Sequence, residues 1–263
     1  MIAVWTALGR HPWLATGALL AAFLTLITGL AIYEHARSPG RETVRKLLHV
    51  GSGVLTLSFP FLFGELWPVL LLTASSAALL GATKCLAPLR RAFGGVVTGV
   101  ERTTFGEIYF PLSVASVFWL SRGKSPLLFC IPILVLTFAD AMGAIVGTRF
   151  GRHRWSGARK SVEGSVAFAA VAFVCILVPL RAWSGAGSGE TLLIGAVLAL
   201  LLMLVEGVAS RGLDNLFVPI GGFLLLQSSL DRDGGTLLVQ LVAVLTLVGV
   251  AFGARRMTTC EGA

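Results

Sequence analysis

The chain has 263 residues, of which 56% are hydrophobic and 13% are charged, and its formal net charge at pH 7 is +8. An average soluble domain has roughly 25% charged residues, so this composition excludes an ordinary soluble domain, and it excludes a disordered chain because such chains are poor in apolar residues. The positive charge does not indicate a nucleic-acid partner, because basic residues gather on the cytoplasmic side of membrane proteins. The sequence therefore predicts an all-α, polytopic integral membrane protein, a bundle of helices in the lipid bilayer.

Nine apolar segments follow one another along the chain, and most approach the length of about 20 residues that a helix needs to cross a bilayer. Their ranges are 13–33, 47–63, 66–82, 108–121, 126–148, 164–182, 191–209, 216–230 and 236–254. Two of them, 108–121 and 216–230, are short for about 30 Å of hydrocarbon, so about seven to nine crossings are expected. No polar stretch is long enough to bury its own core, which predicts a single transmembrane domain over residues 1–263.

The basic residues are distributed unevenly between alternate connections. If the N-terminus is outside and all nine segments cross, the inner face holds 16 of the 21 lysines and arginines. This asymmetry predicts that the C-terminus lies in the cytoplasm, together with residues 34–46, 83–107, 149–163 and 210–215. The expected location is the cell inner membrane, with any site on this face open to the cytoplasm.

Five acidic residues are expected near the inner face, on five different helices. Glu107, Glu163 and Asp214 begin apolar segments, where a helix dipole alone would favour a negative charge. Glu206 precedes the end of its segment by three residues. Asp140 lies nine residues before Arg149, or roughly 12 Å deep, and a helix start does not explain it. Acids at such positions are costly unless they are paired, hydrated or bound to a metal, which favours a functional site.

The residues around these acids suit one kind of chemistry. Carboxylates hold Mg²⁺, and neighbouring lysines and arginines bind the phosphates that share the metal. Gly143, Gly147 and Gly151 recur every four residues near Asp140, which allows a ligand to approach closely; ordinary helix packing would explain the same stripe. Lys160 precedes a predicted helix start, where free backbone N–H groups favour anions, although it could equally anchor the chain at the inner face. The chain has neither a Walker A sequence nor a kinase-type glycine loop.

Four sequence blocks stand between residues 45 and 219. They are RKLLHVG at 45–51, GEIYFP at 106–111, ADAMGAIVG at 139–147 with KSVEGS at 160–165, and EGVASRGLDNLFVP at 206–219. In sequence and order these blocks resemble the polyprenol kinase family, which comprises phytol kinases, dolichol kinases and CTP-dependent diacylglycerol kinases. The resemblance covers a motif-bearing core of about residues 45–219 and leaves out the first and last helices.

The resemblance implies CTP as the phosphoryl donor, because the third and fourth blocks also resemble phosphatidate cytidylyltransferases, which use CTP. It implies an isoprenoid alcohol as acceptor, such as phytol, farnesol, geranylgeraniol or a longer polyprenol. The chain lacks the PGHGG…DR stretch expected of a cytidylyltransferase and has Asp214-Asn215 and then Pro219 instead, which favours the kinase. It is also shorter than typical dolichol kinases, which favours the phytol-kinase-like subgroup.

Charge and resemblance together assign expected roles to individual residues. The expected ligands of Mg²⁺ are Asp140, Glu163, Glu206 and Asp214. The residues expected to bind the nucleotide are Arg45, Lys46, Gly143, Gly147, Arg152, Arg159, Lys160, Ser161 and Asn215. The residues expected to take part in catalysis are His49, Glu107, Asp140, Lys160 and Glu163.

Alternatives remain open at several of these positions. His49 or Glu107 could accept the hydroxyl proton, but His49 could instead make an orienting hydrogen bond or be an ordinary polar residue at a helix end. Arg45 and Lys46 could contact phosphates or anchor the inner face. Two other functions remain as alternatives: a cytidylyltransferase that makes a CDP-lipid from a lipid phosphate, and an ion-coupled transporter, which would place its acids near the bilayer midplane.

Overall fold

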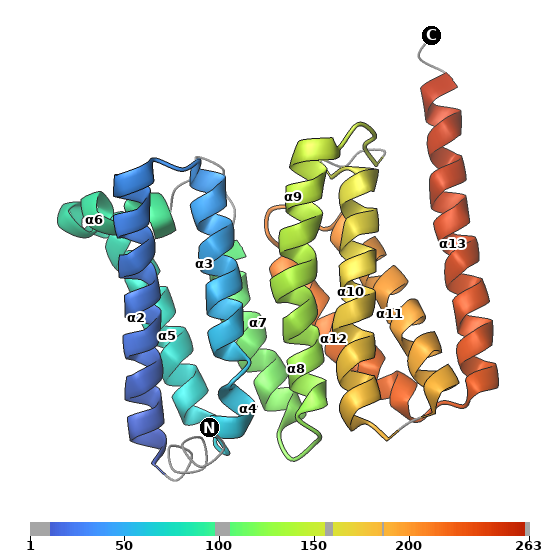
Figure 1. Ribbon diagram of the computed structural model, residues 1–263, viewed down its shortest axis with the longest axis horizontal. Helices are drawn as coiled ribbons and strands as arrows, with labels where there is room; N and C mark the ends of the chain where they lie inside the picture. The colour runs from blue at the N-terminus through green and yellow to red at the C-terminus, as the bar shows by residue number, and fades with distance from the viewer. Residues whose placement is uncertain (1–10, 98–105, 156–159, 186, 261–263) are drawn as a thin grey trace.

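The computed structural model describes residues 11–97, 106–155, 160–185 and 187–260, and among these residues there are helices and no β-strand (Figure 1). The helices are α2 (Pro12–Arg37), α3 (Arg41–Thr56), α4 (Phe59–Leu62), α5 (Trp67–Cys85), α6 (Ala87–Val97), α7 (Gly106–Ser121), α8 (Leu127–Leu134), η1 (Val135–Ala139), α9 (Asp140–Phe150), α10 (Val162–Trp183), α11 (Ser188–Val208), α12 (Asp214–Leu230) and α13 (Gly234–Cys260). The predicted all-α class is confirmed for this part of the chain.

Each of the nine predicted apolar segments lies on one helix or on consecutive helices. Segment 47–63 is interrupted, because α3 ends at Thr56 and α4 begins at Phe59 with Pro60 in its first turn, where proline can start a helix but not continue one. Helix α6 was not among the predicted segments, because its 11 residues mix two arginines with apolar side chains.

Five of the described helices are long and apolar enough to cross a membrane, which makes the chain an integral membrane protein. They are Pro12–Arg37, Leu127–Phe150, Val162–Trp183, Ser188–Val208 and Gly234–Ala251. The apolar stretches Trp67–Thr83 and Ile108–Ser121 are shorter. The number of nine crossings and the orientation of the termini stay predictions.

The rod formed by α8, η1 and α9 lies at the centre of the bundle. Its most apolar window is 61% buried, against 22% for α2 and 11% for α13, which lie at the two sides of the molecule in Figure 1. The core around the rod is aromatic and aliphatic, with Phe129, Phe168, Leu202 and Phe223 almost fully buried. The outward faces of the peripheral helices are also apolar, as expected where a protein contacts acyl chains.

The central rod changes its winding just before Asp140. Pro132 cannot donate a backbone hydrogen bond, and a π-helical turn, Val135–Ala139, comes directly after α8. A π-turn adds one residue to a turn of helix, so the residues after it are rotated about the helix axis relative to the residues before it. Such turns are frequent at functional sites. Here the next residue is Asp140, so the turn sets the direction in which this carboxylate points.

One end of the bundle gathers basic residues. Figure 1 shows that α2, α9 and α13 all finish at this end and that α6 lies across it. We call it the basic end, after Arg37, Arg149, Arg152 and Arg154. The connections from α7 to α8 and from α10 to α11 lie at the opposite end.

Candidate active site

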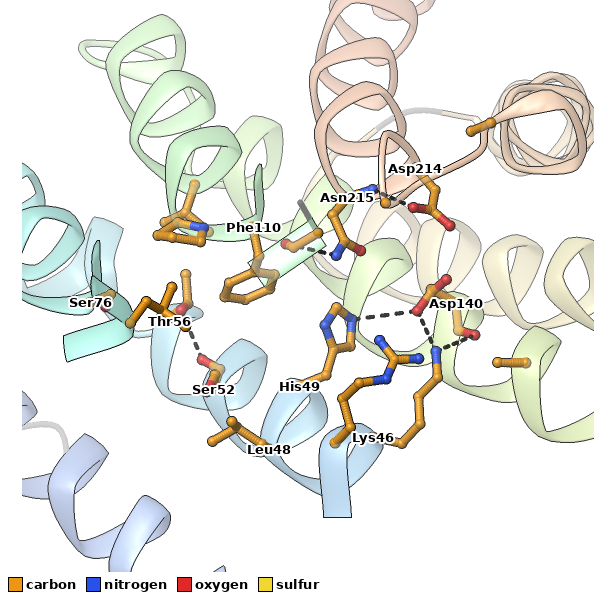
Figure 2. Close-up of a pocket in the computed structure, with 18 of the residues that line it drawn as sticks. Lys46, Leu48, His49, Ser52, Thr56, Ser76, Phe110, Asp140, Asp214 and Asn215 are labelled. Carbon is orange, nitrogen blue, oxygen red and sulfur yellow. Dashed lines mark hydrogen bonds and ion pairs between the residues drawn. The ribbon is translucent and has the colours of Figure 1, made fainter. Parts of the chain in front are cut away.

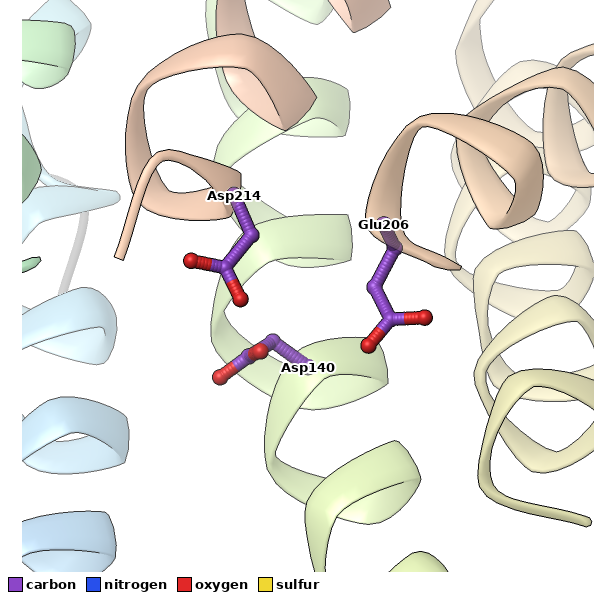
Figure 3. Close-up of side chains that lie close together, drawn as sticks. All are labelled: Asp140, Glu206 and Asp214. Carbon is purple, nitrogen blue, oxygen red and sulfur yellow. The ribbon is translucent and has the colours of Figure 1, made fainter. Parts of the chain in front are cut away.

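Three carboxylates from three helices lie close together (Figure 3). Asp140 begins α9, Glu206 lies in the last turn of α11, and Asp214 begins α12. One ligand oxygen of each residue lies within 4.8 Å of the other two. Asp140 and Glu206 are buried and Asp214 is half-buried. Carboxylates this close together repel one another, so the arrangement requires cations. We call these three residues the carboxylate cluster.

Two lysines supply positive charge to the carboxylate cluster. The Nζ of Lys46, on α3, lies 2.8 Å from Oδ2 of Asp140. The Nζ of Lys160 lies 2.6 Å from Oε1 of Glu206 and 2.7 Å from Oδ2 of Asp214. Burial disfavours the charged form of Lys160, but the carboxylates of Glu206 and Asp214 more than offset this effect and raise the pKa of Lys160. Lys160 is therefore an ammonium at physiological pH.

The donor set of the carboxylate cluster fits a divalent cation. Mg²⁺ prefers carboxylate oxygens, and three of them from a rigid scaffold can enter one coordination shell. The three carboxylates outnumber the two lysines that contact them. Of the four predicted metal ligands, the structure brings together Asp140, Glu206 and Asp214.

Glu163, the fourth predicted ligand, lies elsewhere. Its Oε1 is 2.6 Å from Nδ1 of His153, and the backbone N–H of His153 also donates to its carboxylate. Glu163 thus fastens the turn after α9 to the first turn of α10 and is not part of the carboxylate cluster. Among the predicted phosphate contacts, Arg152 is exposed at the basic end, and Arg159 lies outside the described residues.

The glycine stripe on α9 packs against α10. A Cβ on Gly143 would meet the carbonyl oxygen of Gly164 at 3.1 Å, and one on Gly147 would meet Oγ of Ser161 at 2.9 Å. Helix packing therefore accounts for the small residues, as in the alternative interpretation of the stripe. The cavity described below is lined in part by Gly143, Gly147 and Ser161. A contact between these residues and a nucleotide stays a prediction.

We expect Gly164→Ala to lower the stability of the protein in detergent by about 1–3 kcal/mol, the usual cost of overpacking. Its Cβ would meet the Gly143 carbonyl oxygen at 2.7 Å and the Gly147 Cα at 3.0 Å, and backbone atoms cannot swing aside as a flexible side chain can. Gly29→Ala on α2 is the control, because its Cβ would meet nothing within 4 Å. Thermal unfolding followed by tryptophan fluorescence measures both. Equal melting temperatures would contradict a close α9–α10 contact.

The start of α10 is less available to anions than the sequence suggested. The backbone N–H of Val162 donates to the His153 carbonyl at 2.9 Å, and that of Gly164 donates to Oγ of Ser161 at 3.1 Å. Ser161 is therefore the N-cap of α10. Lys160 and Arg154, which pairs with Ser161 in a backbone bridge, place basic side chains in this region.

His49 supports the π-helical turn. Its Nε2 lies 3.0 Å from the Leu136 carbonyl oxygen and 3.7 Å from Oδ2 of Asp140, and its ring meets the edge of Phe110 (Figure 2). A carbonyl oxygen only accepts hydrogen bonds, so Nε2 carries the proton. The imidazole thus holds the turn that precedes Asp140, as the orienting alternative for His49 anticipated.

Asn215 joins α12 to the start of α7. Its Nδ2 donates to the Gly106 carbonyl at 3.0 Å, and a Cβ on Gly106 would meet this same amide nitrogen at 2.8 Å. The contact fixes the first turn of α7, which carries Glu107, close to Asp214. The side chain of Glu107 lies outside what the structure describes.

Two residues near the cluster were missed from the sequence. Ser165 donates from Oγ to Oε2 of Glu206 at 3.3 Å, and Trp155 donates from Nε1 to Oγ of Ser165 at 3.0 Å. Ser165 lies one helical turn after Ser161 and is the last residue of the KSVEGS block. Its place in that block was the sequence signal from which a role near the cluster could have been predicted. Trp155 had no local signal, because its role depends on how the turn after α9 folds back.

The carboxylate cluster opens into a cavity of about 1820 Å³. Arg45, Lys46 and His49 of α3 line it near the cluster, and side chains of α2, α5 and α7 line its remaining length. Ordinary ligand pockets measure roughly 300–1,000 Å³, so this cavity has room for two substrates.

Comparison with curated proteins identifies three kinases. The chain is 29% identical to a phytol kinase of Synechocystis sp. over 219 residues, which is 81% of this chain and 90% of the relative. It is 33% identical to a dolichol kinase of Schizosaccharomyces pombe over 126 residues, and 35% identical to that of Saccharomyces cerevisiae over 74 residues. These two matches cover 46% and 27% of this chain but only 24% and 14% of the relatives. No protein-family model matches the chain, and no solved structure matches it significantly.

Proposed function

Because the chain belongs to the polyprenol kinase family, we propose that it transfers the γ-phosphoryl group of CTP to an isoprenoid alcohol, with Mg²⁺, at the membrane surface. The observation that carries the proposal is the carboxylate cluster with Lys46 and Lys160 in one cavity that continues between apolar helices. The kinase class is supported by the names of the relatives. CTP is supported by the resemblance of residues 139–165 to a nucleotide-binding block.

In the proposed reaction the alcohol oxygen forms a bond to the γ-phosphorus, the bond from that phosphorus to the β-phosphate oxygen breaks, and CDP leaves. Asp140, Glu206 and Asp214 would hold Mg²⁺, which offsets phosphate charge when it is bound. Lys46 and Lys160 already place ammonium groups at the carboxylate cluster and would bind phosphate oxygens. Such transfer relies mainly on positioning and charge neutralisation.

We assign the uptake of the hydroxyl proton to Glu107. Because Nε2 of His49 donates to the Leu136 carbonyl, Nδ1 is the only atom of this ring that could accept the proton. Glu107 follows Gly106, which Asn215 ties to the start of α12 beside Asp214. The backbone at the start of α7 therefore lies near Asp214.

We expect His49→Gln to keep at least about a third of wild-type turnover, because the glutamine amide can still donate to Leu136, whereas Glu107→Gln loses about 10²-fold or more, as expected when a general base is removed. Initial rates of γ-label transfer measure both variants. His49→Ala is the companion variant, and it should lose more than His49→Gln because the hydrogen bond to the Leu136 carbonyl is then absent. A His49→Gln loss as large as that of Glu107→Gln would return the role of base to His49.

We further propose that the basic end faces the cytoplasm, because CTP is cytosolic and basic connections favour that side. A single cysteine at Arg152, in a background without the four native cysteines, should react with an impermeant maleimide only after the inner face is opened. Asp231 directly follows α12, in the connection from α12 to α13, which Figure 1 shows at the opposite end of the bundle. A cysteine at Asp231 is the matched control and should react in intact cells. The reverse labelling pattern would contradict the orientation and the proposed site.

The decisive experiment uses CTP labelled at either phosphorus, with membranes containing the protein and a panel of lipid alcohols and lipid phosphates. A kinase transfers the γ-label to a prenyl alcohol and releases CDP without pyrophosphate. Entry of the α-label into lipid, with pyrophosphate, would show a cytidylyltransferase instead. The absence of both labels from every lipid would reject both enzymes and favour the transporter alternative.

A further inference from the structure

The cavity continues from the carboxylate cluster into an arm between α2, α3, α5 and α7. We call it the apolar arm and define it by Phe23, Ile27, Ser52, Thr56, Leu72 and Ser76. We infer that the apolar arm holds the isoprenoid tail of the acceptor alcohol, and that side-chain size at Ser76 limits the length of the tail. This inference rests on the proposed function and adds where the tail lies and what selects its length.

The chemistry of the apolar arm suits hydrocarbon. None of the described lining residues from α2, α5 and α7 is charged. Two of the hydroxyls in the arm are engaged by their own helices: Thr56 donates to the Ser52 carbonyl at 2.8 Å, and Ser76 donates to the Leu72 carbonyl at 3.0 Å. An alkyl chain in the arm therefore leaves these donors satisfied.

One helix links the arm to the reacting groups. Lys46, His49, Ser52 and Thr56 lie at intervals of three or four residues, so they share one face of α3, and Figure 2 shows this face along the cavity. The polar head of an alcohol placed beside Lys46 and Asp140 would thus have its tail directed past Ser52 toward Thr56. Figure 2 also shows Ser76 of α5 toward the Thr56 end of the arm.

The length of this face gives a scale for the tail. The ten helical steps from Lys46 to Thr56 rise about 15 Å along the helix. An extended hydrocarbon chain advances roughly 1.3 Å per bond, given carbon–carbon bonds of about 1.5 Å, so the face matches about 12 bonds. Three isoprene units have a main chain of this length. Tails longer than that must pass Thr56 and Ser76, whereas a two-unit tail ends before them.

The first test replaces side chains along the arm and compares geraniol, farnesol and geranylgeraniol as acceptors. Ser76→Phe should lower kcat/KM for geranylgeraniol at least about tenfold relative to geraniol. Ser52→Phe, nearer the reacting groups, should lower it for all three alcohols. Ser116→Phe on α7 is the matched control, because Ser116 does not line the cavity, and it should leave the length profile unchanged. A Ser76→Phe variant with the wild-type profile would overturn the inference.

The second test does not need turnover. A farnesol analogue with a diazirine at the tail end is irradiated with the full-length Asp140→Asn variant in phospholipid nanodiscs, and the label is mapped by mass spectrometry. Labelled peptides should contain Thr56 or Ser76, and excess farnesol should compete. Two results would overturn the inference. Label confined to the outer face of α13 would show that the probe does not enter the arm. Displacement of the probe from the arm by added phospholipid, but not by farnesol, would show that bilayer acyl chains fill the arm.

The two hypotheses fail in different ways. If the wild-type protein transfers no γ-label to any alcohol, the proposed function is wrong, whatever the labelling shows. If it phosphorylates alcohols but the arm variants leave the length profile unchanged, the kinase assignment stands and the tail lies elsewhere.

Discussion

Asp140→Asn is expected to reduce phosphoryl transfer by about 10²–10³-fold, the range seen when one preorganised electrostatic group is removed from an active site. The substitution keeps the volume of the side chain but takes one negative charge from the carboxylate cluster. Lys46 and Lys160 then balance the two carboxylates that remain, so the attraction for a divalent cation falls. The asparagine oxygen can still accept a hydrogen bond from Lys46, which limits the cost of burying that lysine without its ion pair.

Two measurements separate this electrostatic effect from misfolding. Mn²⁺ binding, followed by electron paramagnetic resonance in purified protein, should weaken in Asp140→Asn, while size-exclusion behaviour in detergent stays normal. Asp231→Asn is the control, because Asp231 is exposed at the opposite end of the bundle, and it should change neither property. Wild-type turnover and Mn²⁺ affinity in Asp140→Asn would assign Asp140 a structural role.

Lys160→Ala is expected to reduce transfer of the γ-label by a similar factor of about 10²–10³. A single ammonium there lies within 2.7 Å of both Glu206 and Asp214, so its loss removes the cation that these two carboxylates share. It also removes charge that would otherwise stabilise phosphate oxygens during transfer. Lys160→Arg should recover only part of the activity, because a planar guanidinium does not reproduce the contacts of a compact ammonium.

Lys124→Ala provides the comparison for Lys160. Lys124 lies between α7 and α8 at the end opposite the carboxylate cluster, where its Nζ bonds to Oε1 of Gln227. Its loss should leave transfer of the γ-label within about twofold of wild type. If Lys160→Ala behaves in the same way, or if Lys160→Arg is fully active, the lysine is an anchor at the inner face and not a phosphate contact.

The hydropathy of the sequence was enough to predict the helices. Apolar runs set helix positions locally, so the nine predicted segments coincide with helices, apart from the break after Thr56 and the additional helix α6. The charge argument also identified Asp140, Glu206 and Asp214, because a buried acid in an apolar helix must be compensated wherever its helix is placed. These conclusions depend only on each segment and its solvent.

The partners of each side chain depend on how the helices rotate and approach one another, and only the tertiary structure decides that. Lys46 pairs with Asp140 across 94 residues, in the rotation that the π-turn imposes. Glu163, one residue before Gly164, faces His153 because Gly164 takes the side of α10 that packs on α9. The apolar arm exists because α2, α5 and α7 surround one face of α3. A sequence determines which residues must be compensated, whereas pairing over such distances is determined by packing geometry, which no local pattern encodes.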